Sequence, residues 1–311
     1  MVTETAGPAP APAPPVVPVG RGTRRGRRPG SFAPYLFLLP AFAIFGLFIF
    51  YPAVRVFGLS FTRYSFVSEP VWVGLDNYAR LFADPTFRWA LLNSFLYLLV
   101  TPVLIVISLG IAFLLDAKVR GIKFLRALYF LPVVTPMIVV GILWQWLLNE
   151  DVGLVNYLLV ASGITSTKIN WLTSYPLNLV SVMFVTAWKG LGYFAVIFLA
   201  GLLTIPKEAE EAAVVDGASA FQRLIYIKLP LLKPSITLVA IISSISALKV
   251  FDELYVMIPG APAAEKTLVP LIYQVAFLDF QLGYAAAVSV VLFVVTLLFS
   301  YANLRYWERD T

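Results

Sequence analysis

The sequence contains no cysteine and no histidine. Without cysteine, the chain forms no disulfide and offers no thiolate as a nucleophile or metal ligand. Without histidine, it lacks the side chain that most often serves as a general base or a metal ligand. Both absences weigh against an enzyme. We therefore expect this chain to hold no catalytic residue, no metal site and no cofactor of its own.

Charged residues are scarce as well, at 13% of the 311 residues, whereas 60% are hydrophobic. Soluble proteins average about a quarter charged and about half apolar residues. The apolar excess, with a mean hydropathy of +0.85, indicates a polytopic membrane protein. The formal net charge of +6 comes from basic residues scattered among apolar segments. That distribution favours contact with a lipid bilayer and predicts no nucleic-acid partner.

Long apolar runs predict an all-α fold with about six transmembrane helices. The expected spans are residues 35–59, 87–115, 125–148, 177–203, 234–257 and a last span that ends near 301. Pro132 and Pro136 suggest a bend in the third span. Most lysines and arginines fall in the loops on one side of the membrane and in the two ends of the chain. By the positive-inside rule, we expect both termini in the cytoplasm and the protein in the inner (cytoplasmic) cell membrane.

The first 30 residues differ from the rest of the chain. They are rich in alanine and proline and then become basic, at Arg21, Arg24, Arg25, Arg27 and Arg28. Such a segment cannot bury apolar area, so we expect a disordered basic cytoplasmic tail over residues 1–30. A signal peptide also begins with basic residues, but the following apolar run is too long for one. Residues 31–311 are then the transmembrane domain.

A stretch of dense charge lies between the fourth and fifth expected spans. Pro206 can begin a short helix there, because the first turn of a helix does not use the N–H that proline lacks. Glu210 and Glu211 would then lie near the positive end of the helix dipole. Asp216-Gly217 is a turn signal, since glycine takes positive φ at little cost. The first half of the stretch is therefore predicted to be a helix followed by a turn.

The second half of this stretch predicts another helix. Ser219 can cap it, and the helix would run through Phe221 and Ile225 until Pro230 ends it. The whole stretch is then a helix–turn–helix on the membrane surface. An ordinary amphipathic connector, with Glu211 as a solvated acid at the helix start, is the alternative interpretation.

The same residues resemble the EAA loop of importer-type ABC transporter permeases. The pattern is Glu211-Ala-Ala, three residues, Gly217, nine residues and then Ile227-x-Leu-Pro230. The resemblance implies the type I ABC importer permease fold, with residues 204–230 as a coupling loop that enters a cleft of the cytoplasmic ATPase subunit. The coupling residues that it implies are Glu211, Ala212, Ala213, Asp216, Gly217, Ala218, Ile227, Leu229 and Pro230.

Further segments resemble the carbohydrate type of these permeases, which is related to the larger maltose-permease subunit. They are Gly74-Leu-Asp-Asn-Tyr78, the Trp144…Asn149…Gly153…Asn156 segment, Leu199–Pro206 and Phe251-Asp-Glu-Leu-Tyr255. The alternative for the first of these is an aromatic belt at the level of the lipid headgroups. The family usually continues with a Thr-Gly-Gly-Gly-Pro loop, where this chain has residues 258–263 instead. The details of that outer loop are therefore open.

Ionisable side chains within a span mark candidate solute-pathway positions. Lys249 and Asp252 lie three residues apart and are expected on one face of the fifth span. They would either form an ion pair or line an outer cavity. Lys189 would pair with Asp252 or Glu253 across helices, or extend towards the membrane surface.

Aromatic and amide side chains near the span ends suit sugar recognition, because pyranose rings stack on aromatic faces and amides bond hydroxyl groups. Aromatic residues at span ends also serve as interface anchors, which is the alternative for each of them. Together with the ionisable residues, the candidate pathway residues are Trp144, Gln145, Asn149, Trp188, Lys189, Tyr193, Lys249, Asp252 and Tyr255.

The resemblance implies a membrane-spanning subunit of an ATP-driven, binding-protein-dependent importer for a di- or oligosaccharide. Its implied partners are a second permease in a heterodimer, two ATPase subunits that hold ATP and Mg, and an extracytoplasmic solute-binding protein. The chain has no Gly-x4-Gly-Lys-Ser/Thr loop, so ATP hydrolysis is expected on a separate subunit. Loops near Asn149–Asn156 and Pro259–Lys266 would accept the solute.

Three alternatives stay open at this point. The same type of permease could carry glycerol-3-phosphate or another polar solute. A secondary carrier would need no partner subunits and would show an inverted repeat. A membrane-embedded transferase would need clustered acids or a base at a membrane face, for which the sequence offers little.

Overall fold

The computed structural model describes residues 33–116 and 122–308. The tail of residues 1–30 lies outside the described residues, so its disorder stays a prediction. The chain divides into two units, Met1–Tyr51 and Pro52–Thr311. In the first unit, α1 (Ala33–Phe45) leads into a π-helical turn, η1 (Gly46–Phe50). With α2 (Tyr51–Leu59), these elements form one apolar helix over Tyr35–Leu59, which matches the first expected span.

Three further long helices match expected spans. Helices α4 (Pro85–Tyr97) and α5 (Val100–Asp116) form one span over Pro85–Asp116. Helix α9 (Leu177–Leu202) is the fourth expected span, and α16 (Leu282–Glu308) contains the last one. Helix α5 packs along α9, and α13 (Lys233–Leu248) packs against both α16 and α5. Buried apolar side chains such as Tyr97, Val182 and Phe198 fill these contacts.

Two helix pairs are bent too sharply to be straight spans. Helices α6 (Ile122–Val134) and α7 (Met137–Leu147) meet at 103°, and the helix that ends at Leu231 meets α13 at 66°. The first bend falls at Thr135-Pro136, because proline disfavours helical backbone in the residue before it. The described residues thus contain four helices long enough to span a membrane, or up to six if each bent pair is one span. This agrees with the expected all-α polytopic fold of about six spans.

The fifth span is shorter than the sequence predicts. The prediction continues it to residue 257, whereas α13 ends at Leu248 and a separate helix, α14 (Asp252–Met257), follows. Phe251 adopts φ −138° and ψ −60°, which is not helical. Lys249 and Asp252 flank the break, which the sequence analysis took as ionisable residues within a continuous span.

The segment between the first two expected spans contains the only strands among the described residues. Strands β1 (Thr62–Ser65) and β2 (Ser68–Trp72) pair antiparallel, with Thr62 opposite Trp72, and α3 (Asp76–Ala83) follows. The buried Asn77 amide donates to the carbonyl oxygens of Ser60 (2.9 Å) and Thr62 (2.8 Å). The Gly74–Tyr78 motif therefore fixes this hairpin to the end of α2.

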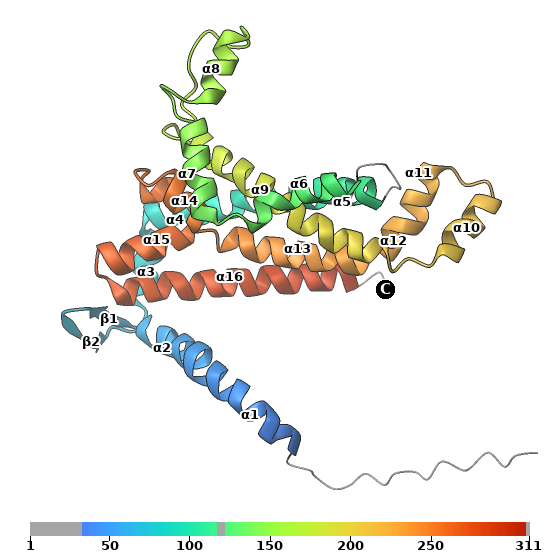
Figure 1. Ribbon diagram of the computed structural model, residues 1–311. Coiled ribbons are helices and arrows are strands. Elements are labelled where there is room, and N and C mark those ends of the chain that lie inside the picture. Colours follow the sequence, from blue (N-terminus) through green and yellow to red (C-terminus); the bar gives the residue numbers. More distant parts are fainter. Residues whose placement is uncertain (1–32, 117–121, 309–311) are drawn as a thin grey trace, which may run out of the picture. The chain divides into compact units, whose positions relative to one another are not determined.

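The remaining elements lie near the two ends of the second unit. They are α8 (Leu154–Ala161), α10 (Lys207–Val215), α11 (Ala220–Arg223), η2 (Leu224–Lys228), α12 (Leu229–Leu231), η3 (Ala263–Glu265), α15 (Leu268–Tyr273) and η4 (Gln274–Leu278). Figure 1 shows α16 running along this unit, with β1, β2 and α3 at one end and α10 and α11 beyond the other. The two ends are described separately below.

Candidate functional site

The first candidate site is the segment from Pro206 to Leu231, here called the coupling hairpin. Its first helix, α10, begins directly after Pro206 and ends at Val215. Gly217 follows with φ +76°, as the Asp216-Gly217 signal predicts. Two backbone bonds close the turn, from Gly217 N–H to Val214 (3.1 Å) and from Ala218 N–H to Ala213 (2.9 Å). This is the common ending of a helix at a left-handed glycine.

The second helix of the hairpin begins with a reciprocal cap. Ser219 Oγ accepts a hydrogen bond from the Gln222 N–H (3.2 Å), and Gln222 Oε1 accepts one from the Ser219 N–H (2.8 Å). This capping box satisfies two N–H groups that have no partner within the helix. The predicted cap at Ser219 is confirmed.

The helix ends at Leu231, one residue beyond the predicted end at Pro230. The π-helical turn η2 precedes the proline, and the Leu229 N–H bonds there to Leu224 O. A π turn shifts the hydrogen-bond register by one residue. The N–H that proline lacks is then lost where the register has already changed, directly before the helix ends.

One ion pair joins the two helices of the coupling hairpin. Lys228 Nζ lies 3.0 Å from Glu210 Oε1, and both side chains are partly buried. Glu211 is exposed and forms no ion pair within the described part of the chain. The hairpin is therefore closed by Glu210, while the neighbouring acid points to its outside.

The tip of the coupling hairpin exposes apolar side chains that the sequence pattern did not single out. Val215 is 86% exposed, Phe221 71% and Tyr226 75%. A cavity of about 290 Å³ beside Gly217 is lined by Tyr226 and Ile227. Of the implied coupling residues, Glu211, Ala212, Asp216, Gly217 and Pro230 are exposed, Ala218, Ile227 and Leu229 are partly buried, and Ala213 is buried. The sequence signal for Val215, Phe221 and Tyr226 was their apolar character within a charged stretch.

The second candidate site is a cavity of about 450 Å³ at the opposite end, here called the outer cavity. One wall is residues 148–151 after α7, and another is residues 257–262 after α14. These are the two loops that the sequence analysis expected to accept the solute, and Gln145 and Asn149 both line the cavity. Three of its lining side chains are acids, Glu150, Asp151 and Glu265. Lys266 lies beside them, and burial lowers the pKa of its amino group.

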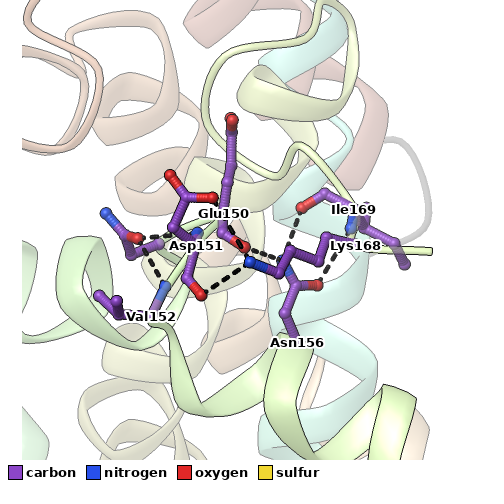
Figure 2. Close-up of polar contacts among 7 residues, drawn as sticks. Glu150, Asp151, Val152, Asn156, Lys168 and Ile169 are labelled. Carbon is purple, nitrogen blue, oxygen red and sulfur yellow. Dashed lines mark hydrogen bonds and ion pairs between the residues drawn. The ribbon is translucent and has the colours of Figure 1, made fainter.

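Several side chains hold the loop on one side of the outer cavity, among them Asn156 and Lys168, which pairs with Asp151 (Figure 2). Asn149 Oδ1 accepts from the N–H groups of Asp151 (3.0 Å) and Val152 (3.1 Å). The Asn156 amide donates to the carbonyls of Glu150 and Ile169, both at 3.0 Å. Its oxygen accepts from Ile169 N–H (3.1 Å) and Trp171 Nε1 (3.0 Å). Asn156 is therefore structural, and Asn149 uses its oxygen within the loop.

A third cavity, of about 250 Å³, lies between α9, α13 and α14 and is here called the inner cavity. Lys189 and Tyr193 line it from α9, Ser243 and Ser246 from α13, and Glu253 from α14. Lys189 thus faces the same cavity as one of the two acids proposed as its partner, although no ion pair joins them in the described structure. The sequence analysis did not single out the serine hydroxyl groups of α13, although a group of serines within an apolar span could have indicated a polar cavity.

The expected arrangement of Lys249 and Asp252 is wrong. They do not share a helix face, because α13 ends at Leu248 and Asp252 begins α14. Both side chains are exposed, neither lines the outer or the inner cavity, and no ion pair joins the two described residues.

The candidate aromatic residues divide into two groups. Trp144 and Trp188 contact each other edge to face, with ring centres 5.5 Å apart, and pack against the core. Tyr255 instead stacks with Phe251 (5.2 Å) and contacts Tyr273 (5.4 Å). The structure therefore brings the candidate pathway residues into several places rather than one pocket.

Comparison with known proteins gives a consistent family. A family model described as "Binding-protein-dependent transport system inner membrane component" matches residues 105–307. The "Trehalose/maltose transport system permease protein MalF" of Thermococcus litoralis is 32% identical over 283 residues, which cover 89% of this chain and 94% of that protein. The "Arabinooligosaccharides transport system permease protein AraP" of Bacillus subtilis is 36% identical over 280 residues, 88% of each chain.

The fold also matches a solved structure. A chain of the crystal structure of a bacterial alginate ABC transporter, in complex with an alginate pentasaccharide-bound periplasmic protein, superimposes with a TM-score of 0.80. The match covers 90% of this chain and 95% of that chain, at 22% sequence identity. At this identity the likeness concerns the fold alone.

Proposed function

Because this chain belongs to the family of binding-protein-dependent transport system inner membrane components, we propose that it is a membrane-spanning subunit of an ATP-driven importer of a di- or oligosaccharide. Its relatives are permease subunits of transporters rather than enzymes. The observation that carries the proposal is the coupling hairpin, a closed helical element with exposed apolar side chains, at the end of the unit opposite to the outer cavity.

The coupling hairpin would receive the motion of an ATPase on a separate polypeptide, which also holds ATP and Mg. Exposed Val215 and Phe221 would enter the cleft of that subunit, and Glu211 would face a basic surface of it. The glycine turn, the capping box and the Lys228–Glu210 pair tie the two helices together. A hairpin held in this way moves as one body, so a push on its tip is passed through Leu232 to α13.

The solute would pass from the extracytoplasmic binding protein into the outer cavity and then towards the inner cavity. The inner cavity offers both an ammonium group, on Lys189, and a carboxyl group, on Glu253. Sugar hydroxyls donate and accept hydrogen bonds, so both groups suit them. An anionic solute such as glycerol-3-phosphate would meet the acids of the outer cavity first. This favours a neutral sugar.

The remaining partners follow from the same scheme. We place a second permease beside this chain in a heterodimer, with two ATPase subunits at the coupling hairpins and the binding protein over the outer cavity. Both termini would then lie in the cytoplasm, in agreement with the distribution of basic residues. The lipid bilayer surrounds the long apolar helices.

The test compares two glycines with the same backbone role. Gly163 ends α8 as Gly217 ends α10, with φ +73° and bonds from Gly163 N–H to Val160 and from Ile164 N–H to Leu159. An added Cβ meets no atom within 4 Å at either glycine. Valine costs about 1–2 kcal/mol of backbone strain at each site. The two substitutions are therefore matched in their local damage.

In reconstituted complexes, Gly217→Val is expected to leave ATP hydrolysis measurable while sugar uptake per ATP falls by about tenfold. Gly163→Val is expected to leave this ratio within about twofold of the wild type, since its strain is remote from the ATPase. Equal uptake per ATP in Gly217→Val and the wild type would contradict the proposal.

A further inference from the structure

A cavity of about 500 Å³ lies near the β-hairpin, and nothing in the transport scheme above uses it. Arg63 from β1, Arg80 from α3 and Tyr284 from the first turn of α16 line it, together with Gln281. The last span begins at Leu282, directly after Gln281. The cavity therefore lies where the chain enters the membrane, at the depth of lipid headgroups.

The position of Arg63 is set by a close backbone contact. A Cβ added to Gly283 would overlap the Thr62 carbonyl oxygen, so only glycine lets β1 approach α16 this closely. Asn77 donates to the same oxygen (2.8 Å). The residue after Thr62 is consequently held beside the start of the span.

The position of Arg80 is set by an aromatic ring. Its guanidinium carbon lies 4.3 Å from the centre of the Tyr284 ring, in a cation–π contact. Tyr284 is buried, and its hydroxyl donates to Asp84 Oδ2 (2.8 Å). Within the described residues, neither Arg63 nor Arg80 forms an ion pair.

The charge balance of the cavity favours an anion. Asp76 is the one carboxylate among its lining residues, against two guanidinium groups. Ser65 and Ser68, whose hydroxyls lie 2.8 Å apart, add further polar groups to the lining. Arginine binds phosphate oxygens with paired N–H groups, which suits a phosphate better than a single-atom anion.

The surface beside the cavity is apolar. Val67, at the hairpin turn, is 96% exposed, and Phe66 and Phe280 are more than half exposed. Their two rings contact each other with centres 5.8 Å apart. A free phosphate would gain nothing from such a surface, whereas the glycerol and acyl part of a lipid would cover it.

We propose that this cavity binds the phosphate of an anionic phospholipid through Arg63 and Arg80, with the lipid body against Phe66, Val67 and Phe280. The site would tie the β-hairpin to the membrane surface. It depends on the membrane insertion of α16 and on none of the coupling assignments above.

The test measures phosphatidylglycerol retained by the purified full-length chain with its co-purifying subunits, by native mass spectrometry during titration. Arg63→Gln/Arg80→Gln is expected to weaken the tightest phosphatidylglycerol binding by about tenfold or more. The matched control is Arg88→Gln, because Arg88 is also exposed near the same end but does not line the cavity. It is expected to retain wild-type binding.

A second variant separates the proposal from simple misfolding. Asp76→Asn removes the cavity's carboxylate, so it is expected to tighten phosphatidylglycerol binding about twofold or more, which a damaged protein would not do. Unchanged binding in both cavity variants would overturn the proposal. Displacement of the lipid by millimolar inorganic phosphate would contradict the claim that the bound phosphate belongs to a lipid. Loss of a protein subunit from Arg63→Gln/Arg80→Gln with unchanged lipid binding would overturn it in favour of a protein partner.

Discussion

The coupling hairpin and the loop that carries α8, here called the outer arm (residues 148–173), end their short helices in the same way. Both use a left-handed glycine and the same pair of backbone hydrogen bonds. The two segments differ in the side-chain contacts that hold the remainder of each segment. The outer arm has a buried centre, Asn156 with four hydrogen bonds, besides exposed ties such as the Lys168–Asp151 ion pair, whereas the hairpin is tied by an exposed capping box and a partly buried ion pair.

This difference suits two different tasks. The outer arm has a polar centre that loses much if one residue changes, so its shape is fixed around the outer cavity. The coupling hairpin is tied by its backbone turn, its capping box and one ion pair between its helices, which leaves its apolar tip free for a partner. Each prediction below tests one side of this comparison, from the largest effect to the smallest.

Asn156→Ala is expected to destabilise the outer arm by about 3 kcal/mol, because it leaves buried N–H and C=O groups without partners. Hydrogen–deuterium exchange should then speed up throughout residues 148–173 while the coupling hairpin exchanges as before. The control is Asn149→Ala, which loses two bonds at an exposed position and should have a smaller effect. If the arm kept its protection in Asn156→Ala, a single side chain would not be what holds it.

Ser219→Ala is expected to cost the coupling hairpin about 1 kcal/mol, since one half of the capping box is lost. The faster exchange should be confined to the peptide that contains α11. Ser162→Ala provides the matched control, because that exposed hydroxyl only donates to a carbonyl of its own helix end. Equal effects of the two variants would mean that the cap does not stabilise the hairpin.

Lys228→Met is expected to weaken the contact between the two hairpin helices by about 0.5 kcal/mol, with a smaller difference from the wild type at high salt. Lys207→Met serves as the control, since Lys207 is an exposed lysine of the same hairpin that forms no ion pair in the described structure. Hydrogen–deuterium exchange rates of α10, measured at low and high salt, test both variants. If Lys228→Met and the wild type responded equally to salt, the Lys228–Glu210 pair would not stabilise the contact between the two helices.

Much of the fold was predictable because long apolar spans and helix ends have strong local signals. The spans near residues 35–59 and 177–202, the turn at Gly217 and the cap at Ser219 all follow from nearby residues. The type of fold followed from the spacing of the EAA-like motif. These features need no information about distant contacts.

The rest depends on contacts between distant residues. The break after Leu248 coincides with Lys249 and Asp252, but two charges alone do not distinguish a broken span from pathway residues within an intact one. The placement of Glu253 opposite Lys189 arises from the packing of α14 near α9. The β-hairpin requires Asn77 to reach back to Ser60 and Thr62. The choice of Glu210 over its neighbour as the partner of Lys228 is likewise set by how two helices meet.

The central claim is that the tip of the coupling hairpin contacts an ATPase on another chain in the cytoplasm. Because the sequence has no cysteine, a single Val215→Cys gives one defined thiol at an 86% exposed position. Val67→Cys, 96% exposed near the opposite end, is the control. The account predicts that a thiol crosslinker joins Val215→Cys, and not Val67→Cys, to the ATPase subunit in assembled complexes. Labelling of Val215→Cys by a membrane-impermeant reagent added outside intact cells, or no crosslink to a second protein, would contradict it.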